Sequence, residues 1–347
     1  MEIKIGKRLI GEGQTCFIIA EAGVNHNGSL ELAKKLINMA KNAGADAVKF
    51  QTFKAENIVT GKTEMANYWK KSTGKKETQL KMLKKYELSF DDFKILKRYC
   101  DRKKIIFLST PHSEDAIDFL KPLVPAYKIA SGDLTNLPFL EKVAKKKKPI
   151  ILSTGMGNLK EVKEAVETIK KSGNNKIILL HCTTSYPCPL EDVNLRVMLT
   201  LKKEFNLPVG YSDHTLGILV PIMAVAMGAK VIEKHFTLNK NLPGPDHKAS
   251  LEPKEFKEMV KVIRDVEKAL GSEIKKPTKS EEKIKKIVRK SIVAKTDIPK
   301  GEKIRKEMLI TKRPGTGIEP KYINKVIGRI TKREIKKDSL IKFQDLK

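Results

Sequence analysis

The sequence lacks the features that mark secreted, membrane-spanning or thiol-dependent proteins. It shows no apolar leader at its N-terminus and no apolar run of membrane-spanning length, so we expect a cytoplasmic protein with no membrane partner. Only four cysteines occur, and none forms a CxxC pair. We therefore expect reduced structural thiols, and neither a disulfide framework nor a thiolate metal site.

Two common catalytic motifs are also missing. No GxGxxG sequence follows the first apolar segment, which disfavours a dinucleotide-binding sheet, and no HExxH sequence indicates a zinc protease. Aromatic residues make up only 6% of the chain and are not interleaved with the lysines. This pattern disfavours nucleic-acid binding. A non-catalytic barrel that binds nucleic acid stays open as the alternative from a different class.

The chain has a large excess of positive charge. Its formal net charge is +29, and residues 271–347 carry 24 basic against 10 acidic residues, about half of that excess. A field of this sign suits an anionic partner. We interpret the partner as a small anionic substrate, and RNA is the less favoured choice.

Apolar and helix-like segments alternate over residues 1–270, after a short lead at residues 1–14. Eight apolar runs have the length of one strand each: CFIIAEAG, AVKFQTF, IIFLST, AYKIAS, PIILSTG, KIILLHCT, LPVGYSD and KVIEKHFT. This order is typical of an α/β protein with a (β/α)8 TIM barrel. An open, doubly wound sheet is the alternative. It is disfavoured because polar residues follow every strand.

These polar side chains form the candidate site. Parallel strands of a barrel end at one common mouth, so their terminal side chains are expected to face each other there. The set comprises Glu21, Asn25, Lys49, Gln51, Ser109, Thr110, Lys128, Ser131, Ser153, His181, Tyr186, Ser212, His214, His235 and Asp246. A single serine at a strand end is usually a helix cap. A set drawn from all eight strands indicates an active site.

Two histidines form the centre of this prediction. Residues 209–237 have the pattern of a strand–helix–strand unit, whose parallel strands bring His214 and His235 to the same edge. Imidazole is the commonest metal ligand in proteins, so the pair predicts a metal site with open positions. Two ordinary histidines at strand ends are the alternative.

Two lysines also end predicted strands. Lys49 and Lys128 each follow an apolar run, where an unpaired ammonium group is costly to bury. With the nearby hydroxyl groups they suit a substrate that carries phosphate and carboxylate. Alternatively, each lysine pairs with a barrel carboxylate such as Glu21 or Glu233. An anion beside a metal that polarises a carbonyl suggests carbon–carbon bond formation.

Eight motifs occur in order along almost the whole chain: IAEAGVNHNGS, AVKFQTF, YKIASGDLTNLPFL, ILSTGM, LHCTTSYPCPLEDVNL, GYSDHT, EKHFTLN and GPDH. Together they resemble the sialic acid synthase family. The resemblance implies a transferase that condenses phosphoenolpyruvate with N-acetylmannosamine and water, giving N-acetylneuraminate and phosphate. The alternative acceptor is 2,4-diacetamido-2,4,6-trideoxymannose, which would make the chain an N,N'-diacetyllegionaminate synthase.

The resemblance also implies roles for individual residues. Mn²⁺ or Mg²⁺ would be bound by His214 and His235. Phosphoenolpyruvate would contact Lys49, Thr110, Lys128, Ser131, Ser153, Thr184 and Ser212, and the sugar would contact Glu21, Gln51, Asn67, Tyr186, Asp246 and Arg313. Catalytic roles would fall to Glu21, Asp246 and His235, with Glu21 or Asp246 handling a proton. Thr184 and His112 depart from the family pattern and leave the precise sugar open.

The end of the chain differs from the barrel. Residues 271–290 are charged and contain a proline, so we predict a linker that becomes helical at its end. Residues 291–347 contain short strand-like runs and are similar to the small β-rich antifreeze-like (SAF, β-clip) domain that ends the same synthases. The resemblance implies a homodimer with swapped C-terminal domains, in which Arg313 reaches the N-acyl group of the sugar. A synthase of keto-deoxy sugar acids is disfavoured because it would leave this domain unexplained.

Overall fold

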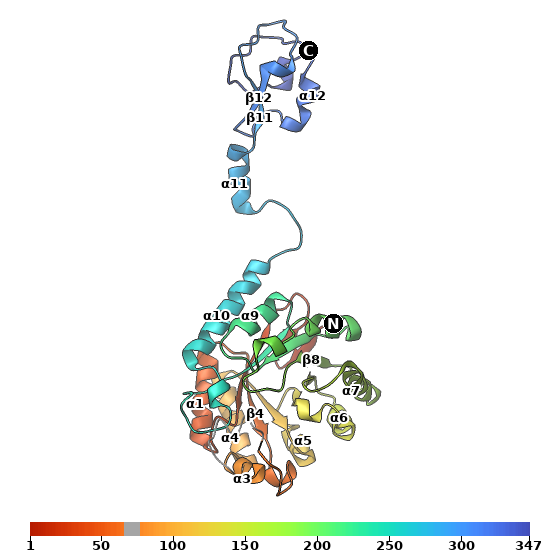
Figure 1. Cartoon of the computed structure of the whole chain (residues 1–347), viewed down its shortest axis with the longest axis vertical. Coiled ribbons are helices and arrows are strands. Elements are labelled where there is room, and N and C mark those ends of the chain that lie inside the picture. The colour runs from red at the N-terminus through yellow and green to blue at the C-terminus, as the bar shows by residue number, and fades with distance from the viewer. Residues whose placement is uncertain (66–76) are drawn as a thin grey trace. The chain divides into compact units, whose positions relative to one another are not determined.

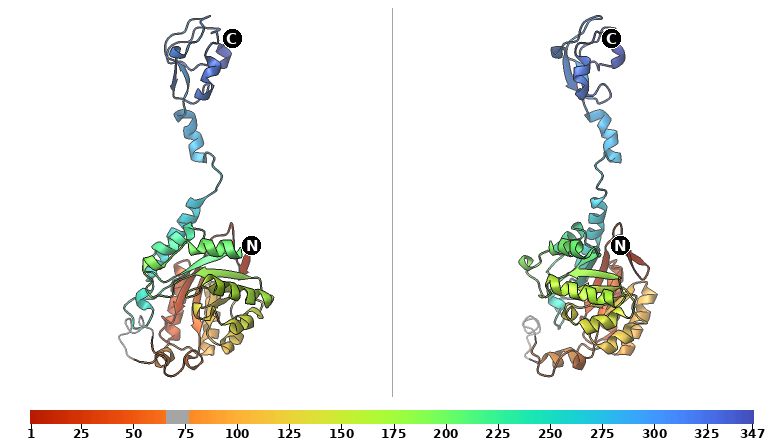
Figure 2. Two further views of the ribbon diagram at one scale, coloured as in Figure 1. Left: turned by 45° about the vertical axis from the view of Figure 1, so that its right-hand side comes forward. Right: turned by 90° about the vertical axis from the view of Figure 1, so that its right-hand side faces the viewer.

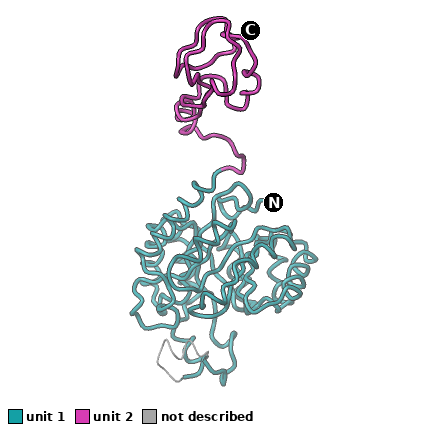
Figure 3. Tube along the Cα trace, turned by 45° about the horizontal axis from the view of Figure 1, so that its top comes forward, with its two compact units in different colours: residues 1–271 teal, residues 272–347 magenta. Residues whose placement is uncertain are grey.

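The computed structural model describes residues 1–65 and 77–347. The chain divides into two compact units, Met1–Gly271 and Ser272–Lys347 (Figure 1, Figure 3). Within the described ranges, no helix combines the length and the apolar character needed to cross a membrane.

The first unit is built on eight parallel strands in the order β5–β4–β3–β10–β9–β8–β7–β6. The outer members, β5 and β6, pack against each other, so the sheet closes into a barrel. The strands are β3 (Phe17–Gly23), β4 (Ala47–Thr52), β5 (Ile106–Pro111), β6 (Tyr127–Ile129), β7 (Ile150–Ser153), β8 (Ile177–His181), β9 (Val209–Asp213) and β10 (Val231–His235). The predicted (β/α)8 barrel is confirmed.

Helices surround this sheet in the two views of Figure 2. They are α1 (Leu30–Asn42), α3 (Gln79–Lys84), α4 (Phe90–Lys103), α5 (Glu114–Leu120), α6 (Leu137–Ala144), α7 (Leu159–Lys171), α8 (Val197–Phe205), α9 (Leu219–Ala226) and α10 (Pro253–Leu270). Local sequence explains where they start. The Ser29 hydroxyl accepts a hydrogen bond from the backbone N–H of Leu32 at α1, and Asn158 and Glu161 form a capping box at α7.

A short hairpin closes the amino end of the barrel. Its strands, β1 (Ile3–Ile5) and β2 (Arg8–Ile10), are antiparallel. Ile3, Ile5 and Ile10 are buried against the apolar side chains that fill the barrel interior. No element was predicted in the short lead at residues 1–14, because three-residue strands are too short to show a clear period.

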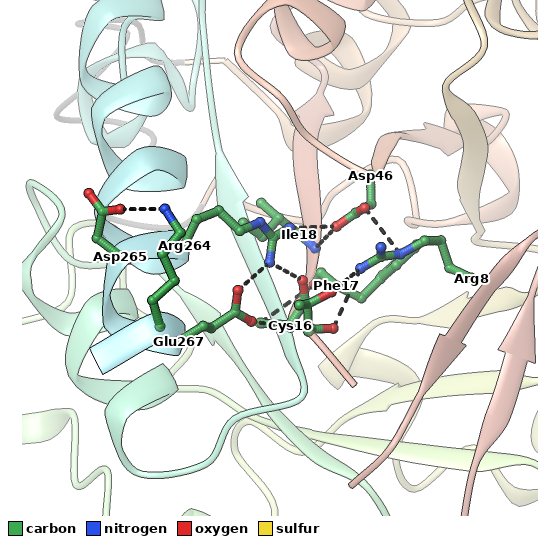
Figure 4. Close-up of polar contacts among 10 residues, drawn as sticks. Arg8, Cys16, Phe17, Ile18, Asp46, Arg264, Asp265 and Glu267 are labelled. Carbon is green, nitrogen blue, oxygen red and sulfur yellow. Dashed lines mark hydrogen bonds and ion pairs between the residues drawn. The ribbon is translucent and has the colours of Figure 1, made fainter. Parts of the chain in front are cut away.

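A polar network lies beside this end and links β3 to α10 (Figure 4). The Arg264 guanidinium donates to the Cys16 carbonyl at 2.8 Å and to the Glu267 carboxylate at 2.9 Å. It also pairs with Asp46 at 3.1 Å, and Asp46 lies 3.3 Å from the Arg8 guanidinium. The Glu267 carboxylate accepts from the backbone N–H of Cys16. Each charged group in the network therefore has partners of opposite sign.

The second unit contains its own small core. It begins with α11 (Lys279–Val288), where Thr278 and Glu281 form a capping box. The strands β11 (Ser291–Ala294) and β12 (Leu309–Lys312) pair antiparallel, and α12 (Ile323–Val326) follows. The buried side chains of this core include Ile292, Ile304, Val326 and Ile341. The linker predicted to become helical contains α11.

We expect Arg264→Ala to lower the free energy of unfolding of the first unit by about 1–3 kcal/mol, because it leaves the partly buried Glu267 carboxylate without its cation and leaves Asp46 with Arg8 alone. Lys268→Ala on the same helix is the matched control. Its ion pair with Asp265 is exposed, so a change below about 0.5 kcal/mol is expected. Urea unfolding measures both variants, and equal effects would contradict the role assigned to the network.

Candidate active site

A cavity of about 400 Å³ opens at the carboxyl ends of the barrel strands. Its lining includes twelve predicted site residues: Glu21, Lys49, Gln51, Thr110, Lys128, Ser131, Ser153, Thr184, Tyr186, Ser212, His214 and His235. A neighbouring space of about 230 Å³ shares Gln51, Tyr186 and His235 and adds Asp246. The fold therefore brings most of the predicted set together.

Two of the residues predicted to contact the sugar, Asn67 and Arg313, are not placed at the cavity by the structure. Asn67 lies outside the described residues. Arg313 belongs to the second unit, where it follows β12 directly. Its predicted contact with the sugar stays a prediction.

Four charged side chains form a buried cluster inside the cavity. The ammonium group of Lys49 lies 2.8 Å from the Glu21 carboxylate and 3.7 Å from that of Glu233. The ammonium group of Lys128 lies 3.6 Å from Glu233. Each of the four residues is at most 5% exposed. Both lysines therefore have the carboxylate partners that the sequence left as an alternative to a bound anion.

Burial and pairing set the protonation of this cluster. Burial raises the pKa of Glu21 to about 7, against the opposing effect of Lys49. Burial alone would also raise the pKa of Glu233, but Lys128 and Lys49 bring it below its ordinary value. With Glu21 protonated, two ammonium groups face one carboxylate. The cavity then attracts an anion.

Hydroxyl groups surround the two lysines. The Lys49 ammonium donates to the Thr110 hydroxyl at 3.0 Å, and the Lys128 ammonium donates to the Ser153 hydroxyl at 2.6 Å. The Ser212 hydroxyl donates to Glu233 at 3.0 Å. These groups are positioned to rotate toward the oxygens of a phosphate or carboxylate.

One wall of the cavity depends on Gly155. A Cβ atom at this position would lie 2.5 Å from the Thr184 hydroxyl, 2.8 Å from the Ser131 hydroxyl and 2.9 Å from the Cys182 sulfur. Glycine therefore leaves the space in which these three side chains meet. The Thr184 hydroxyl is buried and makes no hydrogen bond with the described residues, so it is available to a ligand.

The two predicted metal ligands face each other. The ring centroids of His214 and His235 are 5.8 Å apart, and the Tyr186 ring lies 4.0 Å from that of His214. Nδ1 of His214 contacts the Thr183 carbonyl at 2.6 Å, a contact that requires a proton on Nδ1 and leaves Nε2 with its lone pair. Burial lowers the pKa of His214 to about 4 and that of His235 well below its ordinary value. Both imidazoles are therefore neutral near pH 7.

Three strand-end residues that the sequence placed at the mouth point elsewhere. The Asn25 amide donates to the Phe236 carbonyl, the Ser109 hydroxyl contacts Thr52, and His181 contacts the Val193 carbonyl. Their side chains satisfy backbone or hydroxyl groups outside the cavity. Strand position alone could not separate them from residues such as Ser153.

Gln79 and His112 line both spaces of the site although neither was assigned a role. Gln79 opens α3, which follows the long insertion and no barrel strand, so no strand-end signal marked it. His112 directly follows β5, and its Nε2 has no hydrogen-bond partner among the described residues. Its position in the sequence did indicate the mouth of the barrel.

The fold and the site together define the class: a (β/α)8 barrel enzyme whose cavity combines a buried lysine–glutamate cluster with two neutral histidines. The chain belongs to the NeuB family. Residues 36–275 match the NeuB family and residues 289–347 match the SAF domain.

Relatives with assigned activities extend over nearly the full chain. N,N'-diacetyllegionaminic acid synthase of Legionella pneumophila is 54% identical over 92% of this chain and 91% of that protein. N-acetylneuraminate-9-phosphate synthase of Homo sapiens is 40% identical over 96% of this chain and 93% of that protein. The crystal structure of N-acetylneuraminic acid synthetase from Leptospira borgpetersenii, in complex with citrate, covers 82% of this chain and 95% of that chain. The two chains are 37% identical, and their structures align with a TM-score of 0.73.

Because buried histidines are neutral in the folded protein, we expect the protein to lose stability in acid. Burial lowers the pKa of the fully buried His26, which lies outside the cavity lining, to about 4. Between about pH 6.5 and pH 4 the unfolded chain binds a proton at this residue and the folded chain does not, so stability falls as the pH falls. The free energy of unfolding should fall between pH 7 and pH 5, and His26→Asn should reduce this fall by about 2 kcal/mol. Urea unfolding in the presence of a chelator measures this, and parallel pH curves for both proteins would contradict it.

Proposed function

We propose that this protein condenses phosphoenolpyruvate with an open-chain N-acylamino sugar and water, releasing phosphate. The observation that carries the proposal is the buried cluster of Lys49, Lys128, Glu21 and Glu233, surrounded by hydroxyl groups. Such a site suits a small substrate with a phosphate and a carboxylate. The relatives in the same family support this reaction class.

Two acceptors fit the proposal. The 54% identity to the Legionella pneumophila enzyme favours 2,4-diacetamido-2,4,6-trideoxymannose, with N,N'-diacetyllegionaminate as the product. N-acetylmannosamine, which would give N-acetylneuraminate, is the second candidate. The Leptospira borgpetersenii enzyme supports it at 37% identity.

The lysine cluster would hold phosphoenolpyruvate in one orientation. Lys49 and Lys128 supply positive charge from β4 and β6, while Thr110, Ser153 and Ser212 supply hydroxyl donors. Glu233 keeps the two ammonium groups in place before the substrate arrives. Because the charged groups are buried and already paired with one another, little reorganisation is needed as charge develops in the reaction.

The residues of the site also fit a divalent metal such as Mn²⁺ or Mg²⁺. Nε2 of His214 keeps its lone pair, and Nδ1 of the buried His235 has no partner among the described residues. In the described ranges, no group of three or more histidine, cysteine, aspartate or glutamate side chains gathers for a metal, so these imidazoles would leave positions open. A bound metal would act as a Lewis acid for the sugar aldehyde.

The proposed reaction forms one carbon–carbon bond and breaks the C–O bond to phosphate. C3 of phosphoenolpyruvate attacks the aldehyde carbon and forms the new carbon–carbon bond. Water adds at C2, and the resulting tetrahedral centre loses phosphate by cleavage of the C–O bond. Glu21 lies beside Gln51 at 3.2 Å and has a pKa of about 7, so it can take and return a proton near neutral pH. Asp246 borders the neighbouring space and is the second candidate for this role.

The proposal includes an oligomeric state and a cellular location. We expect a homodimer in which the SAF domain of one subunit caps the barrel of its partner and brings Arg313 to the N-acyl group. A cytoplasmic location fits substrates that are phosphorylated or activated in the cell.

The acceptor can be tested directly. Purified protein with Mn²⁺ and phosphoenolpyruvate is offered the two sugars in parallel, and phosphate release is measured. We expect release with the diacetamido sugar at a kcat/KM at least about tenfold above that for N-acetylmannosamine, because a pocket shaped for the second acetamido group and the C6 methyl group of the first sugar binds the hydroxyl groups of the second less well. The opposite preference would select the second acceptor. Silence with both, in folded protein, would refute the proposed reaction for these sugars.

The histidine pair can be tested by substitution. His214→Ala should lower kcat by about 100-fold or more, because one of two metal-binding imidazoles is lost. His181→Asn is the matched control, since this strand-end histidine contacts the Val193 carbonyl outside the cavity lining. Circular dichroism confirms folding of both variants. Full Mn²⁺-dependent turnover by His214→Ala would show that the metal site is misassigned.

A further inference from the structure

A buried lysine–aspartate pair lies next to the two histidines in the sequence, on the outer face of the strands. It has no part in the proposed chemistry. Side chains alternate along β10, so Glu233 and His235 share the inner face while Lys234 lies on the outer face. Lys234 and its neighbour Asp213 on β9 are register partners, and their side chains are fully buried. Neither residue lines the cavity.

The contacts of Lys234 converge on the segment that carries His214. Its ammonium group donates to the Asp213 carboxylate and to the Thr215 carbonyl, both at 2.5 Å. The Asp213 carboxylate in turn accepts from the backbone N–H of Thr215 at 3.0 Å and from its hydroxyl at 3.2 Å. The residues on both sides of His214 are therefore fixed by one buried group.

Lys234 also lies next to the second histidine, because it immediately precedes His235 on β10. One residue of β10 therefore connects the backbone at His235, through its ion pair and hydrogen bonds, to the two residues that flank His214. A buried charge pair contributes little to stability compared with apolar residues of the same size. Its contribution here is geometric, because its hydrogen bonds attach the Asp213–Thr215 segment to β10 at the end of the β9–β10 ladder.

We propose that Lys234 is a positioning residue that sets the separation of His214 and His235 for a divalent metal. This inference rests on the metal site of the proposed function. It assigns a role to a side chain that touches neither the cavity nor the substrates. Groups behind metal ligands typically change metal affinity or activity by about 10–100-fold when they are removed.

The test measures Mn²⁺ binding without substrates, by electron paramagnetic resonance of free Mn²⁺ over a titration. Lys234→Met should weaken Mn²⁺ binding by about tenfold or more. This variant leaves Asp213 buried without a cation and can fail to fold, so Lys234→Met is also combined with Asp213→Asn. The double variant replaces the charge pair with neutral groups of similar size, and it should fold with the same weakened binding.

Lys148→Met is the matched control. The Lys148 ammonium also donates to two backbone carbonyls, those of Lys121 and Val124, but at the start of β7 and therefore at the amino end of the barrel. Its loss should lower the melting temperature without changing Mn²⁺ affinity. A purely structural role of Lys234 would give the same result as this control.

The outcomes separate the two proposals when His214→Ala is titrated alongside. If His214→Ala loses Mn²⁺ binding while both Lys234 variants bind like wild type, the positioning role is overturned and the metal site stands. If His214→Ala itself binds Mn²⁺ like wild type, the metal site and the positioning role are both overturned. Weakened binding in all three variants, with Lys148→Met unchanged, supports the inference.

Discussion

The central constraint in this structure is the need to pair charges that the barrel removes from water. Lys49, Lys128, Glu21 and Glu233 lie together at the mouth with at most 5% of each residue exposed. Isolated ions at such positions would be very unfavourable. Mutual pairing makes the arrangement tolerable, while burial raises the pKa of Glu21 to about 7 against the opposing effect of Lys49. A cluster that can gain or lose one negative charge near neutral pH is suited to bind an anionic substrate and to handle a proton.

The amino end of the barrel contains the packing that stabilises the fold, and the carboxyl end contains the candidate active site. At the amino end the hairpin of β1 and β2 fills the interior, and Arg264 connects α10 to β3. At the carboxyl end, short polar side chains, open space and neutral imidazoles replace apolar packing. This division is general for barrels, because loops at the carboxyl ends vary while the opposite face maintains the fold. It explains why so many costly buried groups are concentrated at one edge.

The histidines show how burial serves function. All six have a pKa below the ordinary value, with burial as the leading cause. An imidazole must be neutral to bind a metal, so burial would keep His214 and His235 able to bind the proposed metal at a pH where exposed histidines begin to protonate. The charged Lys234–Asp213 pair is placed behind them, on the outer face of the strands. It can fix the positions of the imidazoles while the backbone of β9 and β10 separates it from the cavity.

The sequence alone determined the barrel, the two histidines and the two lysines. His235 ends β10 and His214 directly follows β9, whereas Lys49 and Lys128 lie within β4 and β6 and not at the strand ends that the sequence predicted. All four side chains still line the cavity, because parallel strands have their carboxyl ends at one common edge. The tertiary structure decided which strand-end groups turn inward: Ser153 and Ser212 enter the cluster, whereas Asn25, Ser109 and His181 bond to other groups. It also decided that Glu233 bridges both lysines and that Lys234 pairs with Asp213. These choices depend on distances between strands and on the direction of each side chain, and a linear pattern of residues contains neither.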